Sequence, residues 1–155
     1  MFSISRSIPV NNSTYNHPFL NRNQVWAGLV MKAEDATRFV GAITECRVLE
    51  REERFLLREV VLYGEKMNER VHFFPEQIIV FEPLGGPTKG FIKNEIEEDE
   101  DGNLSVRFTF TFELRTGEQN KAAEKEFSSK MEKSYIEAVE TTLATIRGLV
   151  KDGGL

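Results

Sequence analysis

The stretch Leu104–Leu114, LSVRFTFTFEL, decides the fold of this chain. Every second residue in it is apolar, and serine, arginine, threonine and glutamate fill the positions between. Successive side chains of a β-strand point to opposite faces of a sheet. The segment is therefore predicted to be a strand whose apolar face needs an apolar cover. The residues on that face are Leu104, Val106, Phe108, Phe110, Phe112 and Leu114.

The residues after this strand predict the element that covers it. From Ala122 to Val150, apolar residues recur at steps of three and four, as they do along one face of an amphipathic helix. This face carries Phe127, Met131, Tyr135, Ala138, Val139, Thr142, Ile146, Leu149 and Val150. The sequence thus predicts a sheet packed against one long C-terminal helix.

The N-terminal part predicts a strand at the edge of the sheet, followed by a helix. The strand covers Phe2–Val10, where Pro9 suits an edge or an end position because it has no N–H to donate to a ladder. Asn21 and Gln24, three residues apart, match a capping box and are expected to begin the helix. The predicted order is therefore strand and then helix.

A second short helix and six further strands are expected to follow. Asp35 is a candidate cap for this helix, which ends near Gly41 and buries Phe39. The six strands lie between Ile43 and Leu114, and the dipeptide Gly85–Gly86 marks a loop before the last two.

A hairpin near residue 64 is predicted to turn an arginine and a glutamate inward. A two-residue type II′ turn at Gly64–Glu65 pairs Tyr63 with Lys66 and sets the register of both strands. One face then collects Leu56, Arg58, Val60, Leu62, Met67, Glu69, Val71 and Phe73. Arg58 and Glu69 become diagonal neighbours on this mostly apolar face, and we expect them to form an ion pair.

The last hairpin is predicted to have a three-residue loop, Glu100–Gly102, with Gly102 in a left-handed conformation. A two-residue turn would instead put apolar residues on both faces of the hairpin. The longer loop pairs Ile96 with Val106, Asn94 with Phe108 and Ile92 with Phe110. Asn94 then lies in an apolar wall and needs a hydrogen-bond partner, because an unpaired buried amide costs roughly 1–3 kcal/mol.

The strand that follows Ile43 has two possible orientations. Either Cys46 and Val48 or Arg47 and Leu49 face inward, because the link to the next strand carries no glycine that would reveal the turn type.

Length and composition predict a single domain, residues 1–155, that works without nucleic acid. The chain carries 25 acidic and 20 basic residues, for a net charge of −5, and its cations are scattered. One cysteine cannot form an intrachain disulfide, and we find neither a leader nor an apolar run of about 18 residues. We expect a cytoplasmic protein with no integral membrane association, either a monomer or a weak homodimer.

No metal, cofactor or phosphate site is expected. His17 and His72 have no partner at ligand spacing, and Cys46 fits a small buried hydrophobe. The acidic run Glu95–Asp101 fails the EF-hand template, and Gly85–Gly86 precedes a strand instead of a helix.

The inward polar residues Arg58, Glu69, Asn94 and Tyr135 allow two interpretations. They can satisfy one another inside a filled core, or they can surround a cavity and orient a ligand. In the second case Glu69 and Tyr135 are candidate catalytic residues, with Glu69 as a general base if burial raised its pKa.

The chain resembles the AtaL-like branch of the START-like superfamily, also called SRPBCC, in its element order and in several local phrases. These phrases are QVWAGL at 24–29, VLERE at 48–52, LREV at 57–60, NERV at 68–71, IEED at 96–99, RFTF at 107–110 and ATIR at 144–147. The resemblance covers nearly the whole chain. It implies an α+β helix-grip fold: a strand, two short helices, six further antiparallel strands, and a long C-terminal helix packed in the curved sheet around an apolar cavity.

We therefore expect a carrier or binding protein for a small hydrophobic or aromatic molecule. The expected ligand-binding residues are Arg58, Val60, Glu69, Val71, Phe73, Ile92, Asn94, Val106, Phe108, Phe110, Met131, Tyr135 and Ala138. The alternative is an enzyme of the polyketide cyclase, aromatase or dehydratase kind, in which Glu69 or Tyr135 moves a proton. A third class, an interaction module, would use the edge strand Phe2–Val10.

Overall fold

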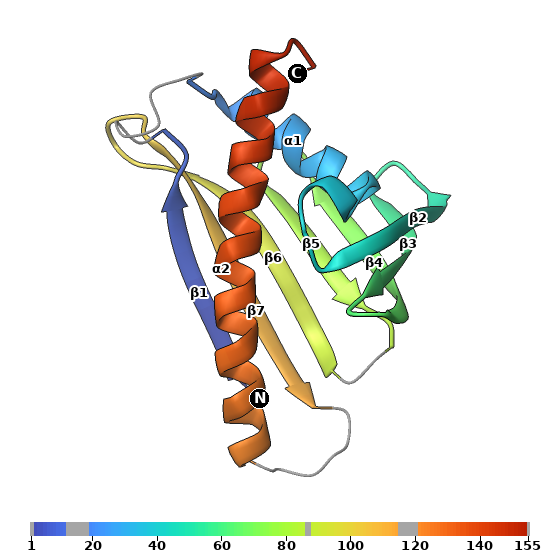
Figure 1. Cartoon of the computed structure of the whole chain (residues 1–155). Helices are drawn as coiled ribbons and strands as arrows, with labels where there is room; N and C mark the ends of the chain where they lie inside the picture. The colour runs from blue at the N-terminus through green and yellow to red at the C-terminus, as the bar shows by residue number, and fades with distance from the viewer. Residues whose placement is uncertain (1, 12–18, 86–87, 115–120, 155) are drawn as a thin grey trace.

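A computed structural model describes residues 2–11, 19–85, 88–114 and 121–154. It has one seven-stranded antiparallel sheet with the strand order β1-β7-β6-β5-β4-β3-β2. The strands are β1 Phe2–Pro9, β2 Ile43–Arg51, β3 Phe55–Leu62, β4 Glu65–Phe74, β5 Ile78–Pro83, β6 Thr88–Glu98 and β7 Leu104–Leu114. The helices are α1 Arg22–Glu34, the 3₁₀ helix η1 Ala36–Arg38, and α2 Lys121–Lys151. The predicted helix-grip fold is confirmed (Figure 1).

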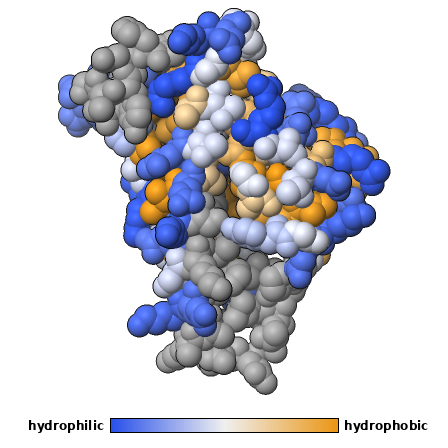
Figure 2. Space-filling model, viewed as in Figure 1, coloured by the Kyte–Doolittle hydropathy of each residue, from blue (hydrophilic) through white to orange (hydrophobic). Residues whose placement is uncertain are grey.

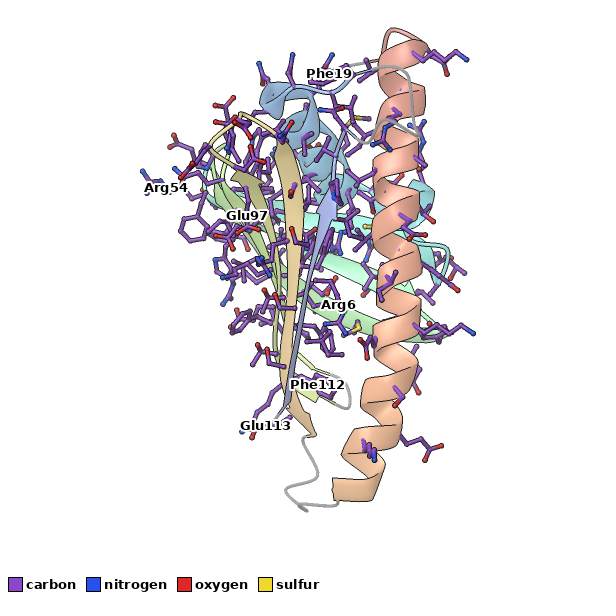
Figure 3. All side chains as sticks on the ribbon, turned by 90° about the vertical axis from the view of Figure 1, so that its left-hand side faces the viewer. Arg6, Phe19, Arg54, Glu97, Phe112 and Glu113 are labelled. Atoms are coloured by element: carbon purple, nitrogen blue, oxygen red, sulfur yellow. The ribbon has the colours of Figure 1, made fainter. Side chains whose placement is uncertain are left out.

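Helix α2 crosses one face of the curved sheet, and α1 lies beside its C-terminal half (Figure 1). The predicted two-faced strand accounts for this packing, because Val106, Phe108 and Phe112 are buried on the helix side of β7. Figure 3 shows Phe112 on that side and Glu113 on the opposite side of the sheet. From α2, Val139, Leu143 and Ile146 complete the core.

The predicted edge strand is confirmed as β1, which pairs with β7 alone. Two arginines join this edge to α2. Arg6, on the helix side of β1 in Figure 3, pairs with Glu132, and Arg147 donates to the backbone oxygen of Val10. No helix in the described residues is long and apolar enough to cross a membrane.

Both predicted caps of the short helices are confirmed. Asn21 Oδ1 accepts from Gln24 N at 2.8 Å, and Gln24 Oε1 accepts from Asn21 N at 2.9 Å, which completes the capping box. Asp35 Oδ1 accepts from Thr37 N at 3.1 Å and begins η1. Phe39, just after η1, is buried as predicted.

Helix α1 touches α2 through a glycine, which makes this contact sensitive to substitution. A Cβ atom added at Gly28 would lie 2.3 Å from Ile146 Cγ1. We expect Gly28→Val to lower the free energy of unfolding by about 2 kcal/mol, because the two helices must separate. Gly148→Val in α2 is the matched control, since a Cβ there meets nothing within 4 Å. Equal losses in urea denaturation would contradict this account.

The β3–β4 hairpin corrects the predicted turn. Tyr63 (φ +50°) and Gly64 (φ +80°) are both left-handed, which is the type I′ pattern, and Leu62 pairs with Glu65. The prediction placed Gly64 and Glu65 at the centre of the turn, one residue further along the chain, because it did not expect a left-handed tyrosine. The register changes by two and the faces stay as predicted. Arg58 now lies directly opposite Glu69 instead of diagonally.

The β6–β7 hairpin has the predicted register. Ile96 pairs with Val106, Asn94 with Phe108 and Ile92 with Phe110, and Gly102 has φ +81°.

The orientation that the sequence left open is settled in β2. Cys46 and Val48 are half-buried and pair with Val60 and Arg58, while Arg47 and Leu49 are exposed. A register shift after Val48 skips Leu49.

Candidate functional site

A pocket lies between the inner face of the sheet and α2. Its volume is about 100 Å³. It is lined by Lys32, Val40, Ala42, Ile43, Arg58, Val60, Leu62, Tyr63, Glu69, Phe81, Ile92, Ala138 and Val139. Figure 2 shows apolar surface in the angle between α2 and the β2–β3 side of the sheet, where the pocket-lining residues of β2, β3 and α2 meet.

Three hollows of about 430 to 470 Å³ lie elsewhere, between β1 and α2, over the outer face of the sheet beside Gly90, and beside the β4–β5 turn. We place the candidate site in the smaller pocket because three buried charged residues, Lys32, Arg58 and Glu69, line it. Buried charges are uncommon in a core of this size unless they are paired.

The predicted ion pair is confirmed, and Arg58 holds more of the structure than the sequence indicated. Its Nη2 and Nε atoms lie 2.8 Å and 3.0 Å from the same oxygen of Glu69, Oε1. Its Nη1 atom donates to the backbone oxygens of Lys32 and Ala33, each at 3.0 Å. These oxygens belong to the last turn of α1, whose carbonyls lack partners within the helix. One guanidinium therefore joins α1, β3 and β4.

Lys32 is the functional candidate that the sequence reasoning missed. Its side chain turns inward from α1, and Nζ donates to Asn94 Oδ1 at 3.1 Å. Nζ also lies 5.4 Å and 5.6 Å from the ring centres of Phe81 and Phe108. Burial, with the nearby Arg58 charge, lowers the pKa of Lys32 to about 7, although Glu69 acts in the opposite direction. A neutral form of the amine is thus much more accessible near neutral pH than for an ordinary lysine.

A signal for Lys32 was present in the spacing of α1. The buried residues of this helix are Val25, Gly28, Leu29, Lys32 and Ala33. Lys32 therefore continues the stripe at steps of three and four, which is the face that packs inward. A lysine at a helix end normally extends into solvent, so the residue type alone places it at the boundary of the stripe.

A hydrogen-bond partner was predicted for the Asn94 amide, and the structure provides one for its oxygen but not for its nitrogen. It is fully buried, its oxygen accepts from Lys32, and its Nδ2 has no partner among the described residues. The oxygen must face Lys32 when that amine is protonated, because an ammonium only donates. A buried donor beside the pocket is therefore left over.

The predicted ligand-binding residues divide into three groups. Arg58, Val60, Glu69, Ile92 and Ala138 lie on the pocket wall. Asn94, Val71, Phe73, Val106, Phe108 and Phe110 are buried in the sheet and do not line the pocket. Met131 and Tyr135 belong to α2, but their side chains lie outside the described part.

The histidines, the cysteine and the acidic residues were also considered as metal ligands in the sequence. Across residues 2–11, 19–85, 88–114 and 121–154, no three His, Cys, Asp or Glu side chains group together as metal ligands would. His72 lies on the outer face of the sheet, 3.5 Å from Glu82, and His17 falls outside the described residues.

Comparison with known proteins identifies one family and several solved structures that have the same fold. The family model AtaL, described as acetylaranotin biosynthesis cluster protein L, matches residues 4–153. No curated protein matches the chain.

Three solved structures are examples of the fold matches. The Streptomyces aromatase/cyclase Zhui matches with a TM-score of 0.75 at 13% identity, over 99% of this chain and 98% of that one. A protein of Thermus thermophilus gives 0.68 at 15% identity, over 93% and 94%. The di-domain ARO/CYC StfQ of the steffimycin pathway gives 0.69 at 12% identity, over 99% and 52%. At sequence identities this low, the matches establish only that the fold is shared.

Proposed function

Because the chain belongs to the AtaL family, we propose that it binds a small hydrophobic or aromatic molecule in the pocket between the sheet and α2. The observation that carries this proposal is the pocket itself, whose walls are mainly apolar and whose inner end holds Lys32, Arg58 and Glu69. Small-molecule sites usually combine apolar walls with a few polar groups that fix orientation.

The size of the pocket limits the enclosed part of a ligand to one aromatic ring at most. Its volume of about 100 Å³ is smaller than that of most drug-sized sites. It is also smaller than the apolar cavity of roughly 150 Å³ that binds benzene. Tyr63 lines the pocket and is exposed at the tip of the β3–β4 hairpin, so a larger ligand would extend past it toward solvent.

The charged groups favour a ligand with an oxygen function. Arg58 is occupied by Glu69 and by the end of α1, whereas Lys32 Nζ makes one described hydrogen bond, to Asn94. An ammonium carries three donors. A phenol, carboxylate or carbonyl oxygen at the inner end of the pocket would meet the donors of Lys32.

A polyketide cyclase or aromatase-like enzyme is the second candidate, and the fold match to Zhui and StfQ favours it. Both candidates use the same pocket. They differ in the fate of the ligand: a carrier releases the compound unchanged, and an enzyme releases a product. A native mass spectrum of freshly purified protein, set beside its denatured mass, would identify any compound carried through purification.

Filling the pocket should weaken binding. We expect Ala138→Leu to weaken the binding of the probe 4-methylphenol by about tenfold or more, because the added carbons occupy ligand space. Ala144→Leu, an exposed site six residues on in the same helix, is the matched control. Ligand-observed NMR titration measures both. Failure of the unaltered protein to bind 4-methylphenol, together with an apo native mass, would overturn the proposal, as would an equal loss in both variants.

A further inference from the structure

We propose that Lys32 forms an imine with a ligand that carries an aldehyde or ketone group. This inference rests on the proposed function, since the carbonyl compound must first enter the pocket. Lys32 lines that pocket and is 7% exposed, so its side chain borders ligand space while it is shielded from bulk water.

The amine is held in place by groups from several strands. Asn94 on β6 accepts its hydrogen bond at 3.1 Å, and the rings of Phe81 on β5 and Phe108 on β7 lie within 6 Å of Nζ. The charged groups that act on it are Arg58 on β3 and Glu69 on β4. The described pocket residues of α2, Ala138 and Val139, are apolar.

The surroundings keep much of the amine in its nucleophilic form. Burial and the Arg58 charge lower the pKa of Lys32 to about 7, while an ordinary lysine titrates near 10.4. Lysines activated in this manner, by desolvation or by a neighbouring cation, are the ones that form Schiff bases with carbonyl substrates.

The reaction balances without any further reactant. The Nζ lone pair attacks the carbonyl carbon, the C=O π pair moves to oxygen, and a proton passes from nitrogen to that oxygen to give a carbinolamine. The nitrogen lone pair then forms the C=N bond as the C–O bond breaks, and oxygen leaves as water with the second Nζ proton. The net change is amine plus carbonyl to imine plus water. Protonation of the imine would restore a cation close to the rings of Phe81 and Phe108.

The unpaired donor of Asn94 fits this chemistry. Its Nδ2 is attached to the same carbon as the oxygen that holds Lys32, and it has no partner in the described part of the chain. A carbonyl or carbinolamine oxygen formed next to Nζ would accept from it. The cost of leaving this donor buried and unpaired would then be recovered when the ligand binds.

Reductive trapping tests the proposal. We expect 4-methylbenzaldehyde with sodium cyanoborohydride to add one arylmethyl group per chain, mapped to Lys32 by peptide mass spectrometry. At pH 7 the labelling of Lys32 should exceed that of the surface lysines, because ordinary lysine amines are protonated there and the pKa of Lys32 is lowered to about 7. Lys32→Met should lose the adduct, and Lys93→Met, on the outer face of β6, should keep it. The N-terminal amine, which titrates near 7.7–8.0, is distinguished by its own peptide.

The outcomes separate this inference from the proposed function. If 4-methylphenol binds but trapping spreads over surface lysines and the N-terminus with no preference for Lys32, the imine is wrong and the ligand site stands. If neither probe binds, both fail. Peptide mapping of the unaltered protein decides the question even if a variant does not fold.

Discussion

Replacing Arg58 with methionine is expected to lower the free energy of unfolding by about 3–5 kcal/mol, because removing one partner of a buried ion pair strands the other. The Glu69 carboxylate would remain buried without its cation. The carbonyls of Lys32 and Ala33 would also lose the donor that satisfies the end of α1. Urea denaturation followed by circular dichroism measures the loss.

Two further variants test the cause of that loss. Removing the stranded charge in the double variant Arg58→Met with Glu69→Leu should recover much of the stability, since well-packed apolar replacements of buried pairs are often tolerated. Arg70→Met breaks an exposed pair with Glu82 on the outer face and should change stability by about 0.5 kcal/mol or less. A loss at Arg58 as small as that at Arg70 would mean that the buried pair is not structural.

The stability of the folded chain should rise with pH above neutrality because of Lys32. Folding lowers the pKa of this amine from the ordinary lysine value of 10.5 to about 7. Between these values the unfolded chain binds more protons than the folded chain, so each unit of pH adds up to about 1.4 kcal/mol to the free energy of unfolding. The full gain is about 4–5 kcal/mol. Below pH 7 both states are protonated and the contribution of Lys32 no longer changes.

Measuring the unfolding free energy of the unaltered protein and of Lys32→Met from about pH 6 to pH 9.5 isolates this contribution. The other titrating groups are common to both chains, so the difference between the two curves reports Lys32. We expect the difference to favour the unaltered protein increasingly as pH rises. Parallel curves would show that the amine keeps an ordinary pKa, which would also remove one of the observations that favour imine formation.

The sequence predicted the fold because its register signals agreed. Three features point to one apolar face of the sheet, the face that packs against α2. They are the phenylalanine stripe of β7, the loop ending at Gly102 and the helical spacing of α2. The hairpin at Tyr63 shows why a local error was harmless. A shift of two in the register exchanges pairing partners and leaves every side chain on its face.

The site was less predictable because a pocket is a local departure from close packing. The spacing that buries Val60 in the pocket wall also buries Val71 in the filled core, and alternation cannot tell them apart. Lys32 was missed for another reason. A lysine on an apolar stripe is compatible with a side chain that extends to water, and only the position of β6, with Asn94 facing α1, shows that it turns inward.

The hydrogen-bond network of Arg58 limits which residues of the pocket can be changed without loss of stability. Arg58 and Glu69, at the inner end of the pocket, also hold α1 against β3 and β4, so mutations of these residues would destabilise the fold. At the outer part of the pocket, Val40, Ala42 and Leu62 are partly buried and apolar and hold no buried charge. Under the proposed function, ligand preference would therefore be changed at these apolar residues, with Arg58 and Glu69 kept constant. Laboratory libraries should randomise the three apolar residues first.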